Sequence, residues 1–181
     1  KEIITAYFDK RTVTHSAVVE KINALRKPQI NWINFLDEDF VGAQLSKLNK
    51  NTKPIFGSMN AQQMIEHLSD VTQIANGNWN VDVFVSDTKA ARRKPFLETK
   101  NELQIGFKAS FLAEEPDKLK FSSIKESIND LIKQIEIFTT VFMEDKNRTV
   151  VHPFFGELDF EYWKKFQVKH FTHHFKQFNL V

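Results

Sequence analysis

The chain has 181 residues, of which 41% are hydrophobic, so it is long enough for one domain with a sizeable core. Its 25 basic and 23 acidic residues nearly cancel, which excludes the broad basic field typical of nucleic-acid-binding and membrane-surface proteins. It contains no cysteine, so a metal site in this chain must use nitrogen and oxygen ligands. No apolar run approaches the roughly 18 residues of a membrane span, and no signal peptide is visible. We therefore expect a cytoplasmic protein with neither a nucleic-acid nor a membrane partner.

Apolar residues recur at helical spacing along five segments of the chain. These segments span roughly residues 14–26, 37–49, 60–76, 123–142 and 159–178. Two of them begin with a capping-box pair three residues apart, Asn60 with Gln63 and Ser123 with Glu126, and Asp159 can cap the last one. The sequence therefore predicts an all-α fold, with an N-terminal extension of one helix over residues 1–36 and a helical bundle over residues 37–181.

Residues 77–121 form a long connection between the third and fourth predicted helices. Apolar and polar residues alternate over 81–85 and again over 103–107, which favours short strands. A connection of this length inside a compact domain is typical of a lid, a binding loop or a segment that wraps over the core.

Three histidines lie on the apolar faces of predicted helices. His170 and His174 are four residues apart, which places both imidazoles on one face of the last helix, about one turn apart. His67 lies on the apolar face of the 60–76 helix and can supply a third ligand from a neighbouring helix. Three neutral imidazoles bind one divalent transition metal and leave coordination positions open, as in catalytic sites. Histidines on apolar faces are also found as hydrogen-bonded core residues, so the pattern alone leaves both interpretations open.

Three segments resemble the DinB-like superfamily: NAQQMIEHL from Asn60, HPFFGELDFEYW from His152 and HFTHHFKQF from His170. They are most similar to a branch that carries an HP-x-FG-x-L motif before its last helix. The resemblance covers roughly residues 37–181. It implies a four-helix bundle of the DinB-like type, with 77–121 inserted between the second and third bundle helices.

The resemblance also implies a function. It assigns zinc or nickel to His67, His170 and His174, and it matches Gln177 to a glutamine that often follows the second histidine of the pair. Members of the superfamily are described as metal-dependent hydrolases or as transferases and isomerases that use a low-molecular-weight thiol. Many are homodimers, so a homodimer is a further expectation.

Two classes of function are compatible with these features. The first is a metal-dependent hydrolase or thiol-dependent transferase acting on a small-molecule substrate, with Asp70, Gln177 and His152 as candidate catalytic residues. Asp70 lies one turn from His67 and is placed to orient its imidazole. The alternative is a non-catalytic bundle with a structural or vestigial metal site, acting as a ligand-binding or interaction module. A fourth protein ligand such as His152, His173 or Asp70 would favour the alternative, because it would close the site.

Overall fold

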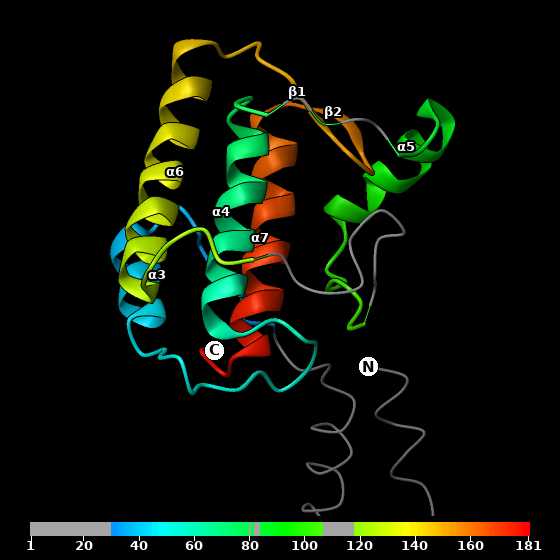
Figure 1. Cartoon of the computed structure of the whole chain (residues 1–181). Helices are drawn as coiled ribbons and strands as arrows, with labels where there is room; N and C mark the ends of the chain where they lie inside the picture. The colour runs from blue at the N-terminus through cyan, green and yellow to red at the C-terminus, as the bar shows by residue number, and fades with distance from the viewer. Residues whose placement is uncertain (1–29, 80, 82–83, 107–117) are drawn as a thin grey trace, which may run out of the picture. The chain divides into compact units, whose positions relative to one another are not determined.

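The computed structural model describes residues 30–79, 81, 84–106 and 118–181 of the chain (Figure 1). Trp32–Val181 forms one compact unit, and its described residues are mainly helical. The helix predicted over 14–26 lies outside the described residues, and the division of the chain after residue 36 stays a prediction. The described elements are α3 (Glu38–Leu45), α4 (Ala61–Ala75), α5 (Asp87–Arg93), the 3-10 helix η1 (Lys94–Glu98), α6 (Ile124–Glu144), β1 (Val150–His152), β2 (Gly156–Leu158) and α7 (Phe160–Gln177).

The starts of α4 and α6 are set by the side chains that the sequence predicts. At α4, Asn60 Oδ1 accepts from Gln63 N and Gln63 Oε1 accepts from Asn60 N, both at 2.9 Å, so the capping box is complete. At α6, Ser123 Oγ accepts from Glu126 N at 3.3 Å. The Glu126 carboxylate accepts from the backbone N–H and hydroxyl of Ser122 instead of closing the box on Ser123. Both helices therefore begin within a residue of the prediction.

The other two long predicted helices also form. Asp159 Oδ1 accepts from Tyr162 N at 2.9 Å and starts α7. Asp37 Oδ1 accepts from Phe40 N at 3.0 Å and starts α3. The latter helix ends at Leu45, four residues before its predicted end, because the following residues turn instead of continuing the helix.

Helix α4 packs against both α6 and α7, and α3 packs against α6 (Figure 1). The core between these helices is rich in aromatic rings. Phe35, just before α3, is fully buried; its ring centroid lies 5.4 Å from that of Phe138 on α6 and 5.3 Å from that of Phe171 on α7. One ring thus joins the segment before α3 to two of the long helices.

The expectation of an all-α fold needs one correction, because β1 and β2 form a small antiparallel hairpin. His152 pairs with Gly156, whose φ of +69° favours glycine, and Trp163 Nε1 donates to Val150 O at 3.0 Å. Strands of three residues are too short to show alternation, so the sequence pattern did not reveal them.

The prediction of strands in the 77–121 connection is wrong for its described residues. Neither the described positions of 81–85 nor those of 103–107 lie in a strand, and the connection instead contains α5 and η1. None of the helices in the described part of the chain has the length and apolar composition needed to cross a membrane.

Candidate metal centre

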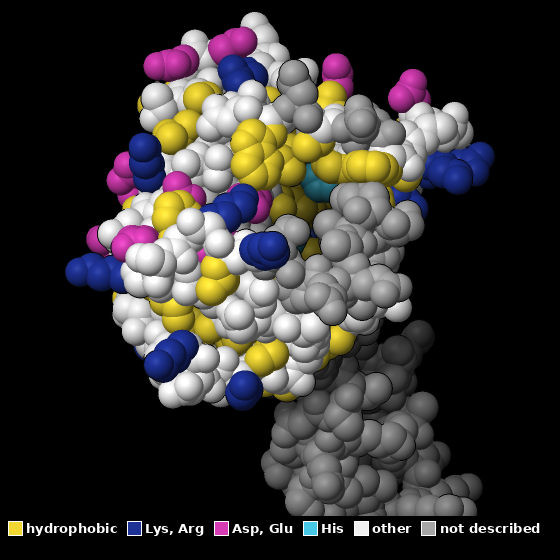
Figure 2. Space-filling model, viewed as in Figure 1, with side chains coloured by type: hydrophobic (Ala, Val, Ile, Leu, Met, Phe, Trp, Pro, Cys, Tyr) yellow, Lys and Arg dark blue, Asp and Glu magenta, His cyan; other side chains and the backbone are white. Residues whose placement is uncertain are grey.

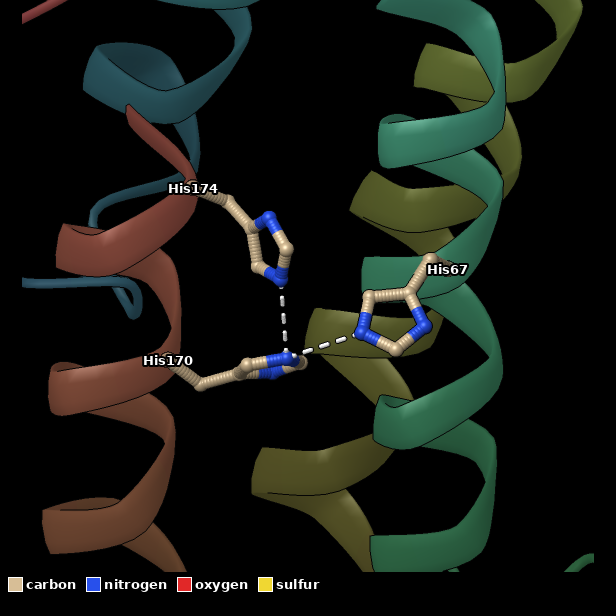
Figure 3. Close-up of side chains that lie close together, drawn as sticks. All are labelled: His67, His170 and His174. Atoms are coloured by element: carbon tan, nitrogen blue, oxygen red, sulfur yellow. Dashed lines mark hydrogen bonds between the residues drawn. The ribbon is translucent and has the colours of Figure 1, made fainter. Parts of the chain in front are cut away.

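The three predicted histidines meet between α4 and α7. Their imidazoles point toward one another across the space between the two helices (Figure 3). His170 Nε2 lies 3.0 Å from His67 Nε2 and 3.2 Å from His174 Nε2. One ring nitrogen from each residue lies within 4.8 Å of the other two, an arrangement that could hold a metal ion.

Two of the three separations between the nitrogens agree with ligation of one ion. Zinc–imidazole bonds of about 2.0–2.1 Å place two ligand nitrogens about 2.9 Å apart at a right angle and about 3.3 Å apart at a tetrahedral angle. The separations of 3.0 and 3.2 Å from His170 Nε2 lie inside that interval. The third pair of nitrogens, from His67 and His174, lies within 4.8 Å.

The site favours neutral imidazoles, which is the protonation state that binds metals. His170 and His174 are 5% and 6% exposed, and His67 is partly exposed. Burial lowers the pKa of His170 and of His174 well below the ordinary value, and the neighbouring imidazoles lower both further. Two rings that cannot take up a proton therefore present lone pairs at neutral pH.

Gln177 fixes the tautomer of His174. The amide group of Gln177 is itself oriented, because its Nε2 donates to Phe56 O at 2.8 Å and a carbonyl oxygen only accepts. Its Oε1 then faces His174 Nδ1 at 2.8 Å, so His174 Nδ1 carries the hydrogen and donates it. His174 Nε2 is left with a bare lone pair directed at the other two imidazoles. Gln177, which the resemblance singled out, thus orients a candidate ligand.

The three converging nitrogens do not satisfy one another by hydrogen bonding. His170 has two possible neutral tautomers. If its Nε2 carries the hydrogen, that hydrogen can point at the bare His174 Nε2, and none is left for the contact between His170 Nε2 and His67 Nε2. If His170 Nε2 is bare instead, its contact with His174 has no hydrogen. A ring nitrogen carries at most one hydrogen, so it cannot make straight bonds to two neighbours. A cation at the centre removes this conflict.

The other predicted site residues lie around the three histidines in different ways. Asp70 Oδ1 accepts from Lys120 Nζ at 2.5 Å, and its predicted role toward His67 stays a prediction. His152 is buried, and its Nδ1 accepts from Phe154 N at 3.0 Å. The ring of Phe166 packs against both His152 and His170, with centroid separations of 4.3 and 5.2 Å respectively. The predicted catalytic role of His152 stays a prediction.

His173 is half-buried, and its ring lies 5.1 Å from that of Phe56. Within the part of the chain that the structure describes, it is absent from the metal-binding group, as are His152 and Asp70. The described residues thus supply three ligands and no fourth one.

Glu66 is a residue whose importance the sequence reasoning missed. It is 5% exposed, and its carboxylate accepts from Ser127 Oγ at 2.9 Å and from Lys120 N at 2.8 Å. Burial alone would raise the pKa of Glu66, but these bonds, with others from Gln62 and Phe121 N, hold it below its usual value. Glu66 thereby fastens the chain before α6 to the helix that carries His67. The available sequence signal was Gln62, four residues earlier on the same face.

In Figure 2, part of a histidine side chain is visible at the surface beside hydrophobic side chains. Large apolar side chains are well exposed in the described part of the connection, with Trp79 at 41% and Phe84 at 50%. Lys120 Nζ, the partner of Asp70, also lies 4.7 Å from the centre of the Trp79 ring.

One protein-family model matches the chain, over residues 114–180, and its description is "Protein of unknown function (DUF1569)". The matched segment includes α6, the β1–β2 hairpin and α7, and therefore His170 and His174 but not His67. Searches of curated proteins and of solved structures found no match. The site itself therefore has to carry the functional argument.

Proposed function

We propose that this chain is a metal-dependent enzyme of the DinB-like kind, with α3, α4, α6 and α7 as its four bundle helices. The observation that carries the proposal is the convergence of three Nε2 atoms, from His67, His170 and His174, on one point between α4 and α7. Zinc or nickel fits this donor set, because both accept imidazole nitrogen. The substrate is a small molecule.

The reaction is hydrolysis or transfer to a low-molecular-weight thiol. A divalent ion bound by three imidazoles supplies Lewis-acid chemistry, which activates water or a thiol at neutral pH. Support for a catalytic over a structural site comes from the number of ligands: the described residues offer three, whereas structural zinc sites are closed by four. The exposed side chains of Trp79 and Phe84 in the 77–121 connection offer apolar surface for a small molecule.

The residues around the histidines have distinct tasks in this proposal. Gln177 holds the His174 lone pair toward the centre. The Phe166 ring stacks on His170 at an interplanar angle of 24° and excludes water from that face. Glu66 keeps the chain at Lys120 and Phe121 against α4 beside His67. Asp70 is the candidate that orients His67.

Metal content tests the proposal first. The protein is purified without a histidine tag or a nickel column, and its metal is measured by elemental analysis for wild type, His170→Ala and His173→Ala. About one equivalent is expected in wild type and in His173→Ala, and none in His170→Ala. His173 is the matched control because it lies on the same helix but outside the three-histidine group. An empty wild type that also fails to bind added zinc or nickel would overturn the proposal.

Activity screens then separate the two reactions. Hydrolysis is followed with small chromogenic esters and amides, and thiol transfer is followed as loss of free thiol in the presence of a small electrophile. The activity that depends on the metal must disappear in His170→Ala and persist in His173→Ala. If a fully loaded wild type has neither activity across broad panels, the non-catalytic alternative replaces the enzyme proposal.

A further inference from the structure

Two buried polar atoms of α7 have no hydrogen-bond partner in the described part of the chain. They are Gln167 Oε1 and His170 Nδ1. Gln167 is 0% and His170 5% exposed, so water does not readily satisfy either atom. The two residues are three apart on one helix, a spacing that makes their side chains neighbours. The acceptor Gln167 Oε1 therefore belongs to a side chain next to that of His170. When His170 Nδ1 carries a hydrogen, it is a donor that also needs a partner.

The Gln167 amide is oriented but held loosely. Thr72 gives its only hydroxyl hydrogen to Leu68 O at 2.8 Å, so its oxygen can only accept from Gln167 Nε2. That contact is 3.4 Å long, at the weak end of the range for hydrogen bonds. Gln167 Oε1 is consequently directed away from Thr72, and little energy opposes a small rotation of the amide.

A metal at the three-histidine centre determines where the hydrogen of His170 lies. Ligation through Nε2 leaves the hydrogen of the neutral ring on Nδ1. The ring of Phe166, stacked on the face of His170, is not positioned to accept it. On the same helix, His174 has already met this requirement by donating its Nδ1–H to Gln177, three residues away. Gln167 stands three residues from His170 in the opposite direction.

We propose that Gln167 is the positioning residue of His170: its Oε1 accepts the Nδ1–H that His170 carries when a metal occupies the three-histidine centre. This inference rests on the proposed function, because it concerns the loaded site. Both metal-binding imidazoles of α7 are then oriented by amides of α7, one by a bond present in this structure and one by a bond that forms on loading. Hydrogen bonds of this kind raise ligand basicity and fix the ring plane.

Zinc affinity measured by calorimetry with zinc chloride tests the inference. Gln167→Met keeps the side-chain length and removes the acceptor, and we expect it to weaken zinc binding about 10- to 100-fold. Gln167→Glu keeps an oxygen acceptor and is expected to bind zinc at least as tightly as wild type. Gln134→Met is the matched control, because it removes a buried amide that pairs with Asn76, the C-cap of α4. Its zinc affinity should stay within about twofold of wild type.

A second readout separates positioning from packing. In the zinc-loaded wild type, imidazole ¹H–¹⁵N spectra should show a His170 Nδ1–H protected from solvent exchange, and Gln167→Met should lose that protection. Thr72→Val removes the present partner of the amide and should leave both the protection and the affinity in place.

Each outcome then decides one question. Wild-type zinc binding with unchanged affinity in Gln167→Met overturns the inference and leaves the proposed function standing. Absence of zinc binding in wild type overturns both. If Gln167→Met fails to fold, an unprotected His170 Nδ1–H in the loaded wild type, or weakened binding in Gln167→Glu, overturns the inference.

Discussion

Replacement of His152 should remove a defined part of the pH dependence of stability. His152 is 4% exposed, and rings surround it: the centroids of Phe155, Trp163 and Phe166 lie 4.8, 5.1 and 4.3 Å away. Burial lowers the pKa of His152 to about 3. His152→Asn keeps an acceptor for Phe154 N, whereas His152→Phe keeps the ring. The two variants lose different contacts of His152, but both lose its titrating imidazole, so an effect common to both reports on the titration.

The magnitude follows from proton linkage. The unfolded chain takes up the proton near the ordinary pKa of 6.5, while the folded chain does so only near 3. Between these values the unfolded state binds one more proton, so the free energy of unfolding falls as the pH falls, by about 1.4 kcal/mol per unit. From pH 7 to pH 5 the accumulated loss is about 2 kcal/mol. Well above pH 6.5 neither state binds this proton, and His152 contributes no slope.

Urea unfolding of metal-free protein at pH 7 and pH 5, followed by circular dichroism, measures this loss. His170 and His174 also contribute to the wild-type slope, since burial lowers their pKa values too. The difference between wild type and variant isolates His152. Both variants should lose about 2 kcal/mol less than wild type between the two pH values. If both lose as much as wild type, His152 titrates normally in the folded protein and the reasoning is wrong.

Two further predictions concern the supports of the metal centre. Gly57→Ala should weaken zinc binding, because a Cβ there would lie 2.6 Å from Gln177 Nε2. Gly106→Ala, also at a φ of +78° but with no atom of the described residues within 4 Å, carries the backbone strain alone and should bind zinc normally. Equal zinc affinities in calorimetry would refute this. Glu66→Gln should lower the free energy of unfolding, measured by urea titration, by about 1–3 kcal/mol, because an amide N–H would then face the Lys120 N–H. An unchanged urea midpoint would show that Glu66 does not fasten the chain before α6 to α4.

Helix positions could be predicted from the sequence because their signals are local. The capping pair at Asn60 and the cap at Asp159 act within one turn, so residues three apart suffice to identify them. The β1–β2 hairpin has no such signal. It depends on contacts from elsewhere in the fold, such as the bond from Trp163 Nε1 to Val150 O. Local patterns therefore predicted the long helices and missed the short strands.

A single apolar stripe was too simple a description of α7. Lys169 on this helix is charged, yet it is only 4% exposed. Its Nζ donates to Thr99 O and Asn101 O at 2.7 and 2.6 Å and lies 4.8 Å from the centre of the Trp32 ring. These partners come from the 77–121 connection and from the segment before α3. Neither the course of the connection nor its contact with α7 can be predicted from helical periodicity.

The candidate metal centre could be predicted as a set of residues but not as a geometry. Spacing placed His170 and His174 on one face, and apolar periodicity placed His67 on another helix. The distances between their nitrogens depend on how closely α4 and α7 pack. That packing is fixed by core residues such as Phe171 and Leu68, which are fully buried. Gln167 and Phe166 gave no sequence signal, since an amide or a ring in a buried stripe has no spacing that distinguishes it.

The strongest argument for a functional centre is that the three histidines are unfavourable as structural core residues. Three converging nitrogens share too few hydrogens for their close contacts, and His170 Nδ1 has no partner in the described part of the chain. Apolar side chains of similar volume would avoid the cost of burying unsatisfied polar groups. Such an arrangement persists only where surrounding packing holds it, and local conflict of this kind is expected at functional sites. Here the aromatic core around Phe35 and Phe171 holds the helices, and the Gln177 amide aims the His174 lone pair at the centre. A cation among the three nitrogens turns this conflict into coordination.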